Sequence, residues 1–365
     1  MIYREYGKTG KQVSILGFGG MRFRNVDDHE ECVRMMLDAA GAGVNYFDTA
    51  PGYMGTRSEQ VFGAAFREFK KKNIPFYCAT KTFKADESSI RRELDVQLKR
   101  LHVDRIDFYH VWCITTLEDW EGRKKKGVID AFRKLRDEGL IGHICVSSHL
   151  IGNQIRELLM ENVFEGVLFG YSAYNFNIRR AAFDAIRKYR LGCVVMNPLG
   201  GGIIPQNPGV FQFIKTKNDE TVVEAALRFI FSHDEINTAL VGFGTREEVA
   251  QAVKAVEGYR RISRADMNRI RKGIHASFAD LCTGCRYCDE CPEGIPIPKF
   301  MDAYNHKLLY GREQELLERL KWHWDMSASP AERCVECGLC EKLCTQHLPI
   351  VKRLKEIVSL NKKSR

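Results

Sequence analysis

The stretch ESSIRRELDVQLKRLHVDRIDFYHVW, residues 87–112, contains the structural unit that decides the fold. Residues 87–101 place apolar side chains at three- and four-residue spacing, as a helix buried on one face requires. Residues 105–112 are a short β-type run. Together they predict one helix followed by one buried strand, and the same alternation continues in both directions along the chain.

Seven further ranges have the character of short buried strands, and most are separated by amphipathic segments such as 180–190. The strand candidates are 15–20, 44–50, 76–83, 141–148, 166–174, 192–200 and 237–244. With 105–112 this makes eight strand units before about residue 260. Eight such units predict an α/β protein, a parallel (β/α)8 TIM barrel.

The pattern changes after about residue 262, where strand-like runs stop. Residues 264–281 are predicted to form a helix, and residues 297–325 are also helical in period and rich in Leu, Tyr and Trp. We therefore expect a barrel over residues 1–275 and a C-terminal α-helical module over residues 276–365.

Bulk composition narrows the class of protein further. The chain of 365 residues has no apolar run long enough for a membrane span and starts with a charged segment, so we expect a cytoplasmic protein without membrane partners. The net charge is +9, but the Lys and Arg residues are spread over many helical faces, which disfavours nucleic acid as a partner.

Thirteen cysteines divide into two groups. Five are scattered: Cys32, Cys78, Cys113, Cys145 and Cys193. Of these, Cys78, Cys145 and Cys193 lie in apolar strand-like runs and are expected to be inert buried thiols. The other eight form two runs with the spacing C-x2-C-x2-C-x3-C: Cys282, Cys285, Cys288 and Cys291, then Cys334, Cys337, Cys340 and Cys344.

This spacing is typical of ferredoxin-type domains that hold two 4Fe-4S clusters, in which the fourth cysteine of each run ligates the other cluster. We expect Cys344 to join the first three cysteines and Cys291 to join the second three. Structural zinc is the alternative, but zinc sites usually take two separated cysteine pairs.

Polar residues at the ends of the second and third predicted strands indicate the chemistry of the barrel. Catalytic residues of such barrels lie at the carboxyl ends of the strands, where Asp48, Tyr53 and Lys81 are found. A tyrosine can act as a general acid near neutral pH only if a cation stabilises its phenolate, and a carboxylate keeps that cation oriented.

Residues 1–260 resemble the aldo-keto reductase family through GKTGKQVSILGFGGMR, NYFDTAPGYMG, ATK, YNF and MNPLGGG. The resemblance implies Tyr53 as the general acid, supported by Lys81 and Asp48. The family's catalytic His corresponds to Trp112, whereas His110 should face the barrel one step deeper. His110 is either a partial substitute or a core histidine, and Trp112 suggests an altered substrate geometry or a different reaction.

The resemblance also implies NADP(H) at the barrel mouth. The cofactor-binding candidates are Gly20, Met21, Ser147, Tyr171, Met196, Pro198, Leu199, Gly242, Gly244 and Arg246. Arg246 would suit a 2′-phosphate. Four positions depart from the family pattern: Ser148, Tyr171, Met196 and Ala252. Because a flavin can exchange electrons singly with a cluster and in pairs with a hydride donor, a flavin is an alternative cofactor.

Three functions are compatible with these features. The first is a reductase of a small carbonyl or conjugated substrate whose clusters carry electrons, with a ferredoxin or flavodoxin as an electron partner. The second is an NADPH-dependent carbonyl reductase whose clusters are purely structural. The third is a non-enzymatic electron-transfer or docking protein. The combination of Asp48, Tyr53 and Lys81 favours the first.

Overall fold

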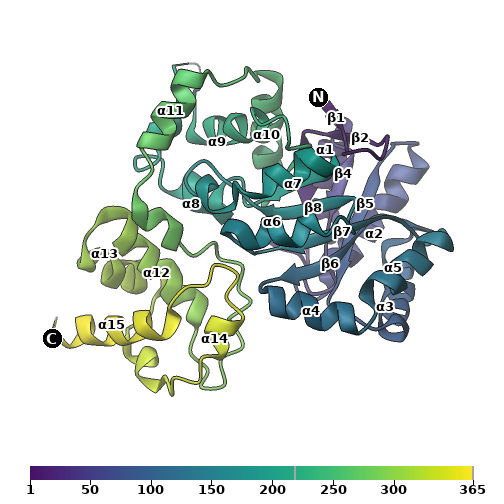
Figure 1. Cartoon of the computed structure of the whole chain (residues 1–365). Helices are drawn as coiled ribbons and strands as arrows, with labels where there is room; N and C mark the ends of the chain where they lie inside the picture. The colour runs from purple at the N-terminus through teal and green to yellow at the C-terminus, as the bar shows by residue number, and fades with distance from the viewer. Residues whose placement is uncertain (218, 364–365) are drawn as a thin grey trace. The chain divides into compact units, whose positions relative to one another are not determined.

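The computed structural model describes residues 1–217 and 219–363, which fold into two compact units (Figure 1). The first unit comprises residues 1–199 and 214–267. The second comprises residues 200–213 and the chain from residue 268 onward. Both units are therefore built from two separate segments of the chain. Residues 200–213 belong to the second unit, although the residues on both sides of them belong to the first.

The first unit is a closed parallel barrel with the strand order β10-β3-β4-β5-β6-β7-β8-β9. This confirms the predicted TIM barrel. The strands are β3 (Leu16–Gly19), β4 (Tyr46–Asp48), β5 (Tyr77–Thr82), β6 (Ile106–Ile114), β7 (Ile141–Ser148), β8 (Gly166–Gly170), β9 (Gly192–Met196) and β10 (Thr238–Gly242).

Helices lie between and after these strands, including over the predicted amphipathic segments 87–101 and 180–190. They are α1 (His29–Gly41), α2 (Arg57–Lys71), α3 (Glu87–Leu101), α4 (Leu117–Lys125), α5 (Val128–Asp137), α6 (Gly152–Met160), α7 (Ala182–Tyr189), α9 (Val222–Phe231) and α10 (Arg246–Glu257). Local signals set their starts: the Asp86 side chain caps α3, and Thr221 and Glu224 form a capping box at α9.

A hairpin of β1 (Tyr3–Glu5) and β2 (Gln12–Ser14) precedes the barrel and delivers Tyr6 into its interior. The Tyr6 ring lies 4.3 Å from the Phe108 ring, between centroids. A Cβ added to Gly166 or Gly192, the first residues of β8 and β9, would lie about 2.0 Å from Tyr6 atoms. These two glycines therefore provide the space in which Tyr6 fills the amino-terminal end of the barrel.

The barrel interior is built in layers because alternate residues of each strand face inward. One layer contains apolar and aromatic side chains that pack together, including Tyr46, Phe108, Leu168 and Val194. Two residues further along their strands lie Asp48, His110, Gly170 and Met196. The register therefore places the polar side chains towards the carboxyl ends of the strands, where catalytic residues were expected. All five scattered cysteines are buried, as predicted for Cys78, Cys145 and Cys193.

The second unit is mainly helical. Its helices are α8 (Ile203–Gln206), α12 (Ile297–Tyr310), α13 (Glu313–Glu318), α14 (Leu339–Lys342) and α15 (Ile350–Lys363), and α11 (Arg264–Lys272) leads into it. A wide turn, Arg319–His323, continues α13. The core packs Phe300, Met301, Leu316, Leu354 and Ile357 together.

The long helix predicted over residues 264–281 is interrupted. It ends at Lys272, and a short 3-10 turn, Ala276–Asp280, follows. A Cβ on Gly273 would lie 2.5 Å from the Phe213 ring, and this ring also stacks on Phe278 at 6.1 Å between centroids. The close approach of the segment 200–213 thus accounts for glycine at the break, and nothing in the local sequence period reveals it. Within the described residues, no helix is long and apolar enough to cross a membrane.

Candidate active site

Asp48 and Lys81 form a buried ion pair inside the barrel. Asp48 is the last residue of β4, and Lys81 lies near the end of the neighbouring β5. Both side chains are almost completely buried, and the Lys81 ammonium donates hydrogen bonds to Asp48 Oδ1 and, at 2.7 Å, to the backbone carbonyl of Thr49. The pair therefore holds the Lys81 ammonium in one position at the carboxyl ends of these strands.

Tyr53 lies on the loop between β4 and α2, directly beside this ammonium. The distance from Lys81 Nζ to the centre of the Tyr53 ring is 5.1 Å. Met54, Gly55 and Thr56, which follow Tyr53, all have left-handed backbone conformations with φ of 52°, 64° and 74°. Such a run is unfavourable for Met and Thr, and strain of this kind tends to occur where a loop must place a functional side chain.

Burial acts on the two charges of the ion pair in opposite directions. It raises the pKa of Asp48 and lowers the pKa of Lys81, and the attraction between the two groups opposes both shifts. Each charge is thus maintained by its partner. The described chain provides no hydrogen-bond partner for Asp48 Oδ2, so this oxygen is buried and unsatisfied.

Trp112 contributes an aromatic wall on β6. Its ring meets the Tyr53 ring edge-on, with 5.7 Å between centroids, and stacks on Phe83 at 4.0 Å. A Cβ on Gly52 would lie 3.2 Å from the Trp112 ring, so glycine at that position allows the loop to approach the indole. Trp112 therefore lies against the proposed general acid, where the sequence comparison placed a histidine.

His110 lies deeper in the barrel, opposite Lys81 in the register between β5 and β6. Its ring is fully buried, and burial together with the Lys81 ammonium lowers its pKa well below the usual 6.5. The nearby Val146 backbone opposes this shift, but within the described chain neither ring nitrogen makes a hydrogen bond of ordinary geometry. His110 is therefore a neutral imidazole.

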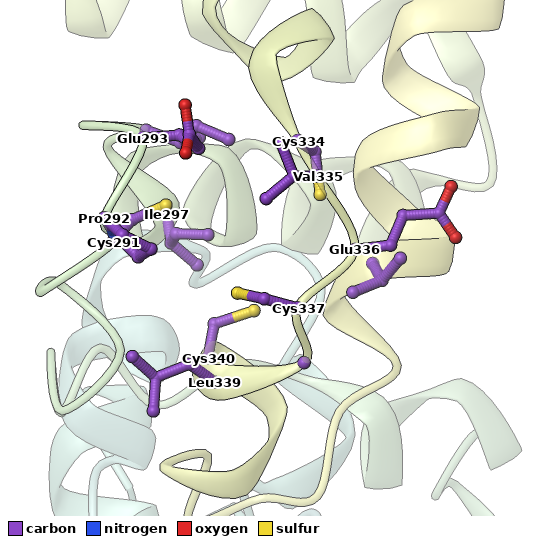
Figure 2. A pocket seen from close by; sticks show the side chains of 13 residues that line it. Cys291, Pro292, Glu293, Ile297, Cys334, Val335, Glu336, Cys337, Leu339 and Cys340 are labelled. Atoms are coloured by element: carbon purple, nitrogen blue, oxygen red, sulfur yellow. The ribbon is translucent and has the colours of Figure 1, made fainter.

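Four of the eight tail cysteines surround one pocket of the second unit (Figure 2). Cys291 of the first run lines it with Cys334, Cys337 and Cys340 of the second, and their side chains point into a common space of about 330 Å³ that includes open solvent. Apolar residues such as Ile297, Val335 and Leu339 complete the lining. This grouping matches the crossed set expected for one 4Fe-4S cluster.

The remaining four cysteines form the second set. Burial raises the pKa of Cys288, and Cys282, Cys285 and Cys344 are close enough to add to that shift. The backbone amides of Gly284 and Leu348 donate to the sulfur atoms of Cys282 and Cys344, each at 3.4 Å. Amide donors of this kind stabilise thiolates and tune cluster potentials, so the site suits an iron-sulfur cluster.

Both sets hold four sulfur donors in partly buried, largely apolar surroundings, which fits 4Fe-4S clusters. Among the described residues, no three or more His, Cys, Asp or Glu side chains converge on one point where a single metal ion could bind. Cluster assembly requires deprotonated thiols, and burial of Cys282 and Cys340 raises their pKa values to about 12 and 11. Iron binding would reverse these shifts because a metal-bound thiol is deprotonated.

The cofactor candidates are distributed over several strand ends. Ser147, Met196 and Gly242 lie on β7, β9 and β10, where alternation turns them inward, and Pro198 and Leu199 follow β9. Two glycines have a packing role: a Cβ on Gly20 would lie 2.4 Å from Ser58 Oγ, and one on Gly242 would lie 2.5 Å from Arg22 Cγ. Met21 stands between Gly20 and Arg22, partly exposed.

Tyr171 does not join this group. Its ring packs against Phe183 of α7 and Phe229 of α9, and its hydroxyl is 3.1 Å from His233 Nε2. The preceding residue, Gly170, occupies the inward position of β8. The Tyr171 side chain therefore lies in the core between the strands and the surrounding helices.

The loop from β10 to α10 carries Gly244, and Arg246 is the first residue of α10. Glu248 accepts a 2.7 Å hydrogen bond from the Gly244 amide, and the Arg246 guanidinium is paired with Asp38 of α1 through contacts of 2.5 and 3.1 Å. Arg22, from the loop after β3, lies over Gly242 in the same region. Cations at this loop suit phosphate groups, whereas the Asp38 carboxylate competes for Arg246.

Sequence reasoning did not identify Arg22, Asp38 or Thr49. Arg22 follows the first barrel strand directly, so its position at a strand end was a usable signal. Asp38 lies 208 residues from its partner Arg246, and Thr49 contributes only its backbone carbonyl. No sequence motif predicts either of these two contacts.

Comparisons with known proteins agree with this geometry. Residues 15–274 match the Aldo/keto reductase family, and residues 281–349 match a 4Fe-4S dicluster domain. The chain belongs to the aldo/keto reductase family and is an oxidoreductase with a C-terminal 4Fe-4S dicluster domain. The predicted family and the predicted type of tail are thus confirmed.

Individual relatives are distant. L-galactose dehydrogenase of Arabidopsis thaliana is 25% identical over 284 residues, covering 69% of this chain and 87% of the relative. The uncharacterized oxidoreductase YrpG of Bacillus subtilis is 25% identical over 305 residues, covering 70% and 91%. The solved structure of aldo-keto reductase AKR11C1 from Bacillus halodurans (holo form) is similar with a TM-score of 0.65 and 26% identity, covering 76% of this chain and 97% of that one.

Proposed function

We propose that this oxidoreductase reduces a small carbonyl or conjugated substrate with Tyr53 as the general acid. In the carbonyl case, a hydride adds to the carbonyl carbon and the Tyr53 hydroxyl proton passes to the carbonyl oxygen, which gives an alcohol. Lys81 compensates the negative charge left on the phenol oxygen, and Asp48 holds Lys81 in place. Solvent then returns the proton to Tyr53.

The observation that carries this proposal is the position of the Lys81 ammonium. It is bonded to Asp48 on one side and lies 5.1 Å from the centre of the Tyr53 ring. In a buried setting an ammonium this close stabilises developing negative charge far more than it would in water. Burial of an ion pair costs desolvation free energy, and a barrel that only docked a partner protein would not need such a pair.

Trp112 and His110 have different roles in this proposal. The Trp112 indole can donate one hydrogen bond but cannot titrate, so it orients the substrate oxygen rather than exchanging a proton with it. Its contact with Tyr53 also fixes the face of the phenol that the substrate approaches. Neutral His110 lies one layer deeper and acts on the ion pair, not on the substrate.

We assign NADP(H) to the strand ends that carry Ser147, Met196 and Gly242, and to Gly244 and Arg246 at the start of α10. A nicotinamide bound there would supply the hydride. Arg22 and the Gly242–Gly244 backbone are suited to its phosphates. The eight tail cysteines would hold two 4Fe-4S clusters, which exchange electrons one at a time with a carrier such as a ferredoxin or flavodoxin.

The proposal is tested by anaerobic assays of protein whose iron, sulfide, flavin and nicotinamide have been quantified. Aldehydes, ketones and enones are offered with NADPH, NADH or a reduced ferredoxin as the electron donor. We expect one substrate class to be consumed with product formed in equal amount. Reduction of the clusters without consumption of any substrate would instead favour an electron-transfer protein.

The role of the clusters is tested with Cys288→Ser. If the clusters carry electrons during turnover, this variant loses ferredoxin-linked activity in protein that remains soluble. If soluble Cys288→Ser protein keeps the full NADPH-linked rate, the clusters are structural and only the barrel chemistry of the proposal stands.

A further inference from the structure

Three buried polar groups at the Asp48–Lys81 pair have no hydrogen bond of ordinary geometry to the described residues. They are Tyr46 Oη, Asp48 Oδ2 and the ring nitrogens of His110, which we call the inner polar trio. Within the described residues none of these atoms makes a hydrogen bond of ordinary geometry, although the Val146 backbone interacts with the His110 ring, and all three residues are at most 2% exposed. Buried polar atoms of folded proteins are almost always bonded to protein or to ordered water, so three together require an explanation.

The register brings the members of the trio to one place. Tyr46 and Asp48 are two residues apart on β4 and therefore face the same side of the strand. The charge of Asp48 contributes to the raised pKa of Tyr46, after burial, which shows that the two groups are close. His110 is opposite Lys81 in the register, and Lys81 is bonded to Asp48.

The Asp48–Lys81 ion pair needs a further hydrogen-bond donor at Asp48 Oδ2, and the trio could help to provide one. A buried ion pair is stable only if the remaining lone pairs of the carboxylate are also satisfied. Lys81 satisfies Asp48 Oδ1 alone. Without a donor at Oδ2, burial favours the neutral forms of both partners, and the ammonium beside Tyr53 would be lost.

We propose that Tyr46 and His110 are positioning residues that hold a buried water molecule against Asp48 Oδ2. The water donates to Oδ2 and is itself fixed by the Tyr46 hydroxyl and one nitrogen of the neutral His110 ring. Three protein partners are the usual number for a buried water. The water and Lys81 then satisfy both oxygens of Asp48, which keeps Lys81 charged. This inference rests on the proposed role of Lys81.

The groups around the trio leave Lys81 as the decisive charge. Cys145 of β7 and Tyr6 face the same interior, and burial raises the pKa of each, so both remain neutral. Cys78, Asp107 and Glu59 also act electrostatically on Tyr46 or Lys81, but more weakly than burial and, for Lys81, more weakly than Asp48. The state of the Asp48–Lys81 pair therefore depends mainly on the solvation of Asp48.

The first test is a high-resolution crystal structure of the holoprotein. We expect an ordered water within hydrogen-bond distance of Asp48 Oδ2 and of both Tyr46 Oη and a His110 ring nitrogen. A structure in which Oδ2 contacts only protein atoms, or in which no water lies there, would overturn the inference.

The second test follows the ammonium itself. The pKa of Lys81 is measured by NMR of isotopically labelled lysine in the holoprotein, with Lys81→Met for assignment. In Tyr46→Phe and in His110→Phe we expect the pKa of Lys81 to fall by about one unit, the effect of one lost hydrogen bond. Tyr6→Phe removes another buried hydroxyl from the same interior and should leave the pKa of Lys81 unchanged.

A conservative variant separates water binding from simple packing. His110→Asn keeps a polar group close to the position of the ring Nδ1, so it should retain most of the wild-type pKa of Lys81, unlike His110→Phe. Equal pKa values of Lys81 in wild type, Tyr46→Phe and His110→Phe would contradict the inference. Because this readout needs no turnover, it can fail while Tyr53 proves catalytic, or succeed while Tyr53 proves dispensable.

Discussion

The Lys81 ammonium lies 5.1 Å from the centre of the Tyr53 ring and is at the same time ion-paired with Asp48. The two contacts come from consecutive elements of the chain: Asp48 ends a barrel strand, and Tyr53 lies on the loop that follows. The ammonium therefore links the carboxylate to the phenol, which makes the charge of Lys81 the variable that controls the site.

Asp48→Asn should shift the alkaline limb of the pH–rate profile to lower pH. Burial lowers the pKa of Lys81, and the Asp48 charge is the largest effect that opposes this. Without that charge the pKa of Lys81 falls further, so the ammonium is lost at a lower pH than in wild type. The profile of kcat from neutral to alkaline pH measures the shift. Asp27→Asn makes the same charge change at an exposed residue and should leave the limb in place.

Trp112→Phe should lower kcat/KM for a carbonyl substrate by about fivefold to tenfold. The phenyl ring keeps the contacts with Tyr53 and Phe83, but the indole N–H donor is lost, which costs about 1 kcal/mol. The measurement is steady-state kinetics with the aldehyde or ketone that the wild-type protein consumes. An unchanged kcat/KM would show that the indole contributes only packing contacts and no hydrogen bond to the substrate.

Asp38→Asn should increase the preference for NADPH over NADH. Arg246 is the candidate for a 2′-phosphate, but its guanidinium is paired with Asp38. Releasing it from a partly exposed pair is worth at most about 1 kcal/mol, or about fivefold in the ratio of Kd values. Cofactor titrations of wild type and variant measure this ratio.

The control for this experiment is Asp234→Asn, which breaks a comparable exposed pair with Arg261. It should leave the ratio unchanged. If Asp38→Asn also leaves the ratio of the Kd values for NADPH and NADH unchanged, Arg246 does not contact the cofactor. If neither nicotinamide binds the wild-type protein, the assignment of NADP(H) itself fails.

Serine variants of the tail cysteines should reveal the crossed grouping. Cys291→Ser and Cys334→Ser should damage the same cluster, because both side chains line one pocket. Cys288→Ser should damage the other cluster, although Cys288 is only three residues from Cys291. EPR of the reduced proteins, with iron quantification, distinguishes the two defects. Identical spectra for Cys291→Ser and Cys288→Ser would indicate that each run binds its own cluster.

Much of the fold was predictable because its signals are local. The strands around Asp48, Lys81 and His110 are short apolar runs bounded by helical segments, and the structure places α3 over the predicted range 87–101. The inward direction of these three residues follows from strand alternation alone. The tail spacing was equally informative, since four cysteines at fixed intervals have few uses.

Other features depend on contacts between distant parts of the chain. Tyr6 fills the barrel end only because β8 and β9 begin with glycines more than 150 residues away. The segment 200–213 joins the second unit, and its Phe213 meets Gly273, where a periodic helix would otherwise continue. The pairing of Arg246 with Asp38 is of the same kind. No local pattern specifies such partners, so sequence reasoning could name the residues but not their contacts.

The most direct test of the account is the kcat/KM of Tyr53→Phe for its carbonyl substrate, measured anaerobically on protein with a wild-type content of iron and sulfide. A missing general acid should reduce the rate by about 10²- to 10⁴-fold. Tyr189→Phe, which removes a hydroxyl bonded to the Met160 carbonyl on the outer helices, should keep the wild-type rate. Wild-type turnover in Tyr53→Phe would contradict the assignment of Tyr53 as the proton donor.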